Sequence, residues 1–205
     1  AFRESYRLIT WDMRGHGQTE IPGPEQLSVA RLAQDVAELA DVLGSQQFHV
    51  AGSSAGEEKH GLTELGHAAL ARMEELSLIA DLAHASPATI RDVLAQATRP
   101  VVVSHTGVKA TCPGPRNLSD DEIRGVAANG GLIGIGAFEG AVCDTTPRAV
   151  ARAMRYVRDL VGIEHVALGS DFDGAVTTAF DSSETAVLVE ALFAEGFTPD
   201  EVRLA

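Results

Sequence analysis

The chain has 205 residues, a formal net charge of −13, 45% hydrophobic residues and a mean hydropathy of +0.04. This is enough apolar material for the core of one large domain or two small ones. The negative charge argues against nucleic acid or an anionic membrane as a partner, since both bind basic surfaces. The sequence contains no run of about 18 apolar residues, so we expect no transmembrane segment.

The first part of the chain predicts a β-α-β unit, with strands over 6–11 and 48–51 around a helix over 28–43. From residue 62 onward, helical patterns alternate strictly with short apolar runs. The expected helices are 63–75, 86–97, 119–129, 147–161, 183–194 and one that opens at 199; the expected strands are 78–84, 101–105, 131–138 and 165–170. This alternation predicts an α/β fold with a mainly parallel sheet.

Three of the expected strands end in polar residues, namely His84, His105 and Asp171. The carboxyl ends of parallel strands meet at one edge of a sheet, where α/β folds place their chemistry. One strand-helix-strand unit separates the two histidines, so we expect them on adjacent strands. Imidazoles are common zinc ligands, and a nearby carboxylate can move a proton. The pattern therefore indicates a zinc site at His84 and His105 with Asp171 as the acid/base.

The two cysteines, Cys112 and Cys143, have no CxxC spacing. We therefore expect no disulfide framework, which fits a reducing compartment. The start of the chain has no apolar signal core. Together these features predict a cytoplasmic location.

Residues 1–56 resemble an α/β-hydrolase fragment. The resemblance rests on the turn at 12–17, Asp-Met-Arg-Gly-His-Gly, and on Gly52-x-Ser54-x-Gly56 after a strand. It implies Ser54 as a nucleophile, which would need a base to be activated. Residues 57–61, Glu-Glu-Lys-His-Gly, replace the small apolar helix of that family and form the expected seam.

Residues 61–205 resemble the membrane (renal) dipeptidase family, zinc metallopeptidases of the amidohydrolase-like type. The matching motifs are Gly61-Leu62-Thr63-x-x-Gly66, Asp81-Leu82-Ala83-His84-x-Ser86, Pro100 to His105, Pro115 to Asp120 and Gly169 to Gly174. The resemblance implies a partial TIM barrel over 62–205, namely its second half of four βα units, truncated at the C-terminus. An open barrel edge would favour association into a homo-oligomer.

The same resemblance implies roles for individual residues. His84 and His105 would ligate zinc, Arg116 would bind the terminal carboxylate of a dipeptide, and Asp171 would be the acid/base. Asn117 and Asp173 would position the loop and turn that carry them. The family site holds two zinc ions, and the motifs for its first-site ligands and bridging glutamate are absent from this sequence.

Three hypotheses follow. The first is a zinc-dependent dipeptidase that cleaves by attack of a metal-bound hydroxide, with its site incomplete in this chain. The second is a non-catalytic fusion or truncated fragment, stabilised by pairing with another chain. The third is a serine hydrolase that uses Ser54.

Overall fold

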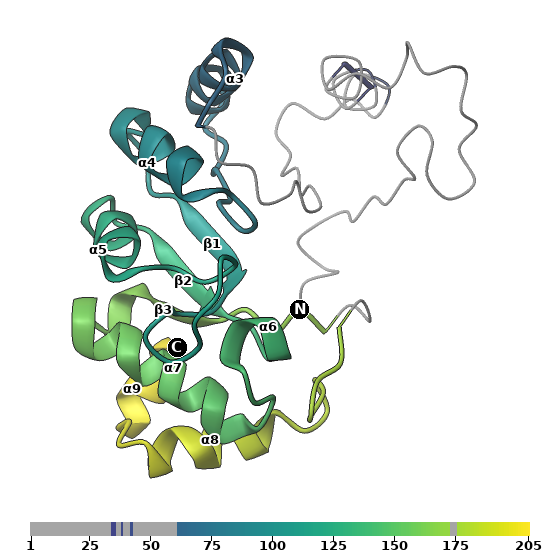
Figure 1. Cartoon of the computed structure of the whole chain (residues 1–205), viewed down its shortest axis with the longest axis vertical. Coiled ribbons are helices and arrows are strands. Elements are labelled where there is room, and N and C mark those ends of the chain that lie inside the picture. The colour runs from purple at the N-terminus through teal and green to yellow at the C-terminus, as the bar shows by residue number, and fades with distance from the viewer. Residues whose placement is uncertain (1–33, 36–37, 39–41, 43–60, 173–175) are drawn as a thin grey trace. The chain divides into compact units, whose positions relative to one another are not determined.

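We analysed a computed structural model of the chain, which describes residues 34–35, 38, 42, 61–172 and 176–205 (Figure 1). The chain divides into two units, Ala1–Phe48 and His49–Ala205. In the first unit the described residues are all helical and fall within the helix expected over 28–43. The strands expected at 6–11 and 48–51, Ser54 and seam residues 57–60 lie outside the described residues. The second unit is described below.

The second unit contains a three-stranded sheet, in the order β1-β2-β3. The strands are β1 (Val102–Thr106), β2 (Leu132–Ile135) and β3 (Val166–Leu168). Both neighbouring pairs are parallel, with Val102 opposite Leu132 and Ile133 opposite Val166. The prediction of an α/β fold with parallel strands is confirmed for this part of the chain.

The strand expected over 78–84 forms only a single parallel bridge, between Asp81 and Val102. Two backbone hydrogen bonds hold this bridge: Leu82 N donates to Val102 O at 2.8 Å, and Val102 N donates to Ala80 O at 2.9 Å. The apolar run does continue before the bridge, but Ile79 is 46% exposed. Within the described residues no strand pairs with the other edge of this segment, so the extended ladder that the apolar run predicts does not form.

Most helices begin and end within two residues of their predicted bounds, and side chains cap the N-termini of five of them. The predicted helices are α3 (Glu64–Glu75), α4 (Pro87–Gln96), α5 (Asp120–Ala128), α7 (Pro147–Val161), α8 (Thr185–Ala194) and α9 (Pro199–Leu204). Ser119 and Glu122 form a reciprocal capping box at the start of α5, and Thr198 and Glu201 form another at the start of α9. The short helices α6 (Glu139–Val142) and η2 (Ile163–His165) were not predicted. No described helix has both the length and the apolar character to cross a membrane.

The core lies between the sheet and a layer of helices in which α4 packs on α5 and α5 on α7 (Figure 1). Its largest fully buried side chains come from the strands and from the inner faces of α5 and α7: Val103, Ile133, Ile135, Val166, Ile123, Val126, Met154 and Val157. This packing fixes the carboxyl ends of the strands relative to one another. It is the arrangement of consecutive βα units in a barrel.

A disulfide joins Cys112 and Cys143, contrary to the expectation from their spacing. The two cysteines are 31 residues apart in sequence, but their Cα atoms are only 5.4 Å apart. Cys112 lies in the loop after β1 and Cys143 at the end of α6, and the fold brings these segments together. Since disulfides persist in oxidising environments, cysteine usage no longer supports the predicted reducing compartment.

Candidate functional site

His84 and His105 lie side by side at the carboxyl ends of two neighbouring extended segments, as the sequence predicts. Their Nε2 atoms are 2.9 Å apart, and the ring centroids are 4.9 Å apart with an interplanar angle of 63°. His105 belongs to β1, while His84 follows the Asp81 bridge in a left-handed conformation with φ of 64°. Such a backbone conformation is unusual for a non-glycine residue and is often found at functional sites.

Polar contacts surround the two imidazoles. Arg116 has no acceptor atom, so its Nη2, 3.1 Å from His84 Nε2, donates to that nitrogen. His105 Nε2 lies 2.9 Å from the same nitrogen, and the Ser104 hydroxyl lies 3.0 Å from His105 Nδ1. These contacts place both rings between Arg116 and Ser104.

Two carboxylates influence the site electrostatically. Burial lowers the pKa of His84, and the nearby positive charge of Arg116 lowers it further, while Asp171 and Asp81 act in the opposite direction. Burial also lowers the pKa of Arg116, again opposed by Asp171 and then Asp81. The neutral imidazole favoured at His84 is the form that ligates metals.

Asp171 lies after β3, half-buried and with a φ of 63°. Its charge reaches both His84 and Arg116. The structure therefore brings together the four residues that the sequence singles out in the second unit. Asp173, the remaining member of that motif, lies outside the described residues.

The pair of imidazoles matches the donor set of a zinc ion. Two nitrogens bound to one tetrahedral zinc lie about 3.4 Å apart, given Zn–N distances of about 2.0–2.1 Å. The observed 2.9 Å between the Nε2 atoms is slightly shorter, so a small separation of the rings would admit the ion. Within the described part of the chain, no group of three or more His, Cys, Asp or Glu side chains could hold a metal. The two histidines therefore fit as two ligands of a larger set.

Hydrogen bonds with residues of β1 hold both the side chain and the backbone of Arg116 in place. Nη2 donates to His105 O at 2.9 Å, and the Arg116 carbonyl accepts from the Thr106 hydroxyl at 3.2 Å. The guanidinium carbon lies 5.8 Å from the centroid of the Phe138 ring, which also packs edge-on against His105 at 6.4 Å. Phe138 thus completes the wall of the site.

Asp81, Ser104 and Phe138 are site residues that were not predicted. Asp81 Oδ1 accepts from the backbone N–H groups of Ala83 and Ser104, both at 3.0 Å, and so joins the two segments that end in histidine. Asp81 and Ser104 belong to two of the dipeptidase motifs, Asp81 to Ser86 and Pro100 to His105. Those motifs were the signal that could have identified them. No pattern in the sequence marks Phe138, because its contacts depend on α6.

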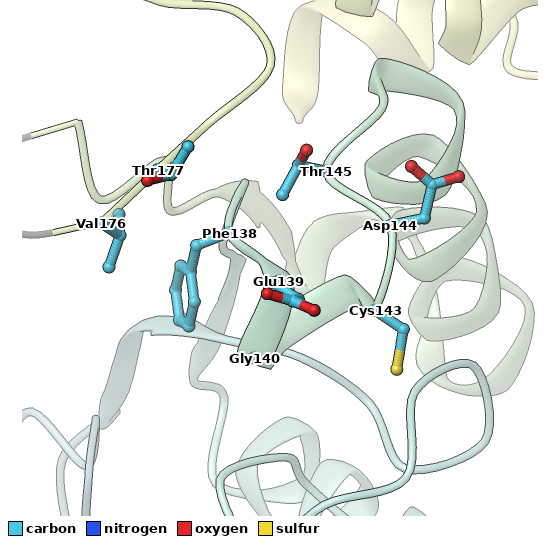
Figure 2. A pocket seen from close by; sticks show the side chains of 8 residues that line it. All are labelled: Phe138, Glu139, Gly140, Cys143, Asp144, Thr145, Val176 and Thr177. Carbon is cyan, nitrogen blue, oxygen red and sulfur yellow. The ribbon is translucent and has the colours of Figure 1, made fainter.

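A pocket of about 640 Å³ lies beside Phe138 (Figure 2). Its lining comes from α6 and the residues after it, and from the facing segment at 176–177: Phe138, Glu139, Gly140, Cys143, Asp144, Thr145, Val176 and Thr177. An antiparallel bridge between Phe138 and Thr178 holds the two sides together. The pocket shares Phe138 with the histidine site.

The family model described as Membrane dipeptidase (Peptidase family M19) matches residues 34–205. The chain belongs to the membrane dipeptidase family. The family match begins upstream of residue 61, where the motif resemblance begins. The resemblance drawn from the motifs is thereby confirmed.

Two fungal dipeptidases are similar to this chain. Dipeptidase aclJ of Aspergillus oryzae is 36% identical over 162 residues, which are 74% of this chain and 38% of the relative. Dipeptidase verJ of Clonostachys rogersoniana is 33% identical over 156 residues, 74% of this chain and 40% of the relative. The chain spans about two fifths of the length of these curated relatives.

Solved structures of the family have the same fold. A metallopeptidase from Rhodobacter sphaeroides, liganded with a phosphinate mimic of the dipeptide L-Ala-D-Ala, superposes with a TM-score of 0.72 at 25% identity. The superposition covers 83% of this chain and 55% of that structure. The metallopeptidase called dipeptidase AC gives a TM-score of 0.68 at 27% identity, over 72% of this chain and 45% of the other.

Proposed function

We propose that the chain carries part of the active site of a zinc-dependent dipeptidase, in the second half of a TIM barrel. The observation that carries this proposal is the convergence of the His84 and His105 Nε2 atoms, 2.9 Å apart, beside Arg116. Membership of the membrane dipeptidase family supports it. The dipeptide mimic bound to the Rhodobacter sphaeroides structure indicates the class of substrate to test.

His84 and His105 would hold the metal through their Nε2 atoms. A zinc ion at this position would act as a Lewis acid that activates water near neutral pH and polarises a carbonyl group. The Asp81 carboxylate and the Ser104 hydroxyl orient the two histidine segments from behind. Outer partners of this kind fix the direction and tautomer of ligating imidazoles.

Arg116 would bind the terminal carboxylate of the dipeptide. Among the described residues its side chain donates hydrogen bonds only through Nη2, to His105 O and His84 Nε2. Nη1 and Nε make no hydrogen bond among the described residues, and each carries an N–H that can donate to a ligand oxygen. Packing against Phe138 keeps that plane in place.

Asp171 would act as the acid/base. Its carboxylate follows β3 and acts electrostatically on both His84 and Arg116. A carboxylate there can take a proton from the attacking water and deliver it to the leaving amine. The left-handed backbone at Asp171 limits the directions that its side chain can take.

Zinc analysis combined with turnover tests this proposal. The chain is loaded with zinc, dialysed and analysed by inductively coupled plasma mass spectrometry, and hydrolysis of L-Ala-D-Ala is followed. Retained zinc and turnover that are both lost in His105→Ala support the dipeptidase. His67→Ala is the matched control, because His67 is an exposed histidine of α3 bonded to Gln96. Zinc-free, inactive protein favours the non-catalytic hypothesis, and a fluorophosphonate probe that labels Ser54 favours the serine hydrolase.

A further inference from the structure

The loop from residue 107 to residue 118, between β1 and α5, carries Arg116. Its two ends are tied together, because Leu118 N donates to Gly107 O at 3.0 Å and Lys109 N donates to Leu118 O at 2.8 Å. Between these ends the loop leaves the sheet edge and returns to it. The position of the Arg116 guanidinium therefore depends on what holds the outer part of this loop.

The outer part of the loop is attached to α6 at two points. One is the Cys112–Cys143 disulfide. The other is the side chain of Asn117, whose Nδ2 donates to Cys112 O at 2.7 Å and to Ala141 O at 3.1 Å. Asn117 is buried and directly follows Arg116, so the residue beside the arginine is bonded both to the cysteine and to the helix.

The helix on the other side of these bonds also shapes the site. Phe138 immediately precedes α6, and its ring contacts both Arg116 and His105. A shift of the loop relative to α6 would therefore separate Arg116 from its aromatic neighbour and from His105 O. The disulfide is the covalent bond that prevents this shift.

We propose that the Cys112–Cys143 disulfide positions Arg116 for carboxylate binding, so that opening the disulfide selectively weakens recognition of the substrate's terminal carboxylate. The inference rests on the proposed function, since it takes Arg116 as the carboxylate-binding residue. Cys112 is a positioning residue here, because it acts through the loop and through Asn117. The oxidised chain is the form that binds dipeptides well.

The disulfide is accessible from one side. Cys112 is only 2% exposed, whereas Cys143 is exposed and lines the pocket beside Phe138 (Figure 2). A dithiol would therefore attack the Cys143 sulfur, release Cys112 as a thiol and then resolve the mixed disulfide. In this exchange the protein disulfide takes up two electrons and two protons to give two thiols, and the dithiol is oxidised to a cyclic disulfide.

Calorimetric titration of the zinc-supplemented chain tests the proposal with two ligands. One is the phosphinate mimic of L-Ala-D-Ala, and the other is the same compound with its terminal carboxylate converted to a carboxamide. In the disulfide-bonded chain the acid should bind more tightly than the amide, and Arg116→Ala should remove this preference. Cys112→Ser/Cys143→Ser should weaken binding of the acid about tenfold, as expected if roughly a tenth of the molecules hold Arg116 in place. The amide affinity should be unchanged.

Two further samples keep the result interpretable. The wild-type chain reduced with dithiothreitol should behave like the double serine variant, with free thiols verified by alkylation and mass spectrometry. Gly114→Ala, a loop substitution whose new methyl group would meet no atom within 4 Å, should behave like wild type. Circular dichroism is recorded for every sample.

The outcomes separate this inference from the proposed function. If the oxidised chain binds neither ligand, or if Arg116→Ala keeps the preference for the acid, the proposed role of Arg116 fails, and the inference fails with it. If Arg116→Ala removes the preference but opening the disulfide leaves it intact, only the inference is overturned. Loss of the native circular dichroism in both the serine variant and the reduced chain would also overturn it, since the disulfide would then hold the whole fold.

Discussion

The Nε2 atoms of His84 and His105 lie 2.9 Å apart, although 21 residues separate the two histidines in sequence. The bridge between Asp81 and Val102 fixes the register of the two segments that carry these histidines, because it aligns the segment before His84 with the start of β1. Asp81 reinforces the alignment by accepting a hydrogen bond from Ser104 N at 3.0 Å. The relative placement of the two histidines is therefore set by backbone pairing.

Ser104→Ala should lower the affinity of the chain for zinc by about tenfold, as is typical when an outer partner of a ligating histidine is lost. The Ser104 hydroxyl lies 3.0 Å from His105 Nδ1 and can accept a hydrogen bond from it once Nε2 holds the metal. Competition with a chromogenic chelator measures the affinity. Ser104→Thr keeps a hydroxyl and should stay close to wild type. Equal affinities in Ser104→Ala and wild type would contradict the assigned role.

Gly169→Ala should destabilise the chain by about 1–3 kcal/mol, the usual cost of overpacking a core. A methyl group on Gly169 would lie 2.1 Å from Ser104 O and 2.9 Å from His105 Cα, so β1 must move. Urea denaturation measures the loss, and zinc binding should fall with it because His105 shifts. Gly114→Ala is the control, since its methyl group would meet no atom within 4 Å. Similar stabilities of the two variants would refute the prediction.

Glu195→Gln should lower the free energy of unfolding by about 1.5–3 kcal/mol, the range for hydrogen bonds that involve charged groups. The Glu195 side chain is 4% exposed and pairs with Arg148 at 3.1 Å and Arg155 at 2.9 Å, which joins the end of α8 to α7. Chemical denaturation gives the difference. Glu190→Gln changes an exposed glutamate of the same helix and should alter stability by less than about 0.5 kcal/mol. A loss of the same size in both variants would rule out the Glu195 ion pairs as its source.

The loss of folding stability caused by Tyr156→Phe should become smaller as the pH becomes strongly alkaline. The Tyr156 hydroxyl donates to Asp120 Oδ1 at 2.8 Å, and this hydrogen bond raises the pKa of Tyr156, with Arg124 acting weakly in the other direction. Its contribution is complete below the ordinary tyrosine pKa of about 10 and is lost as the pH rises through the raised value. Unfolding of wild type and Tyr156→Phe, compared at about pH 8 and above about pH 10, should show a shrinking difference. A constant difference would contradict this linkage.

The sequence by itself determined the longer helices and the class of fold. Capping is local: the side chains of Thr63, Ser86, Ser119, Thr146 and Thr198 each accept a hydrogen bond from an N–H three residues later, within the first turn of their helices. The alternation of these helices with short apolar runs was sufficient to predict parallel strands. The polar residues at the strand ends, His84, His105 and Asp171, could also be found because the end of a strand is visible as the end of an apolar run.

Only the tertiary structure decided the contacts between distant segments. The Cys112–Cys143 disulfide, the contact of Arg116 with His84 and the packing of Phe138 on His105 depend on how the loop after β1 meets α6. The segment 78–84 shows the same limit, since its apolar run predicts a strand but the pairing stops at Asp81. Local patterns report what one turn or one strand prefers, whereas these contacts depend on the spatial meeting of segments that are not neighbours in sequence.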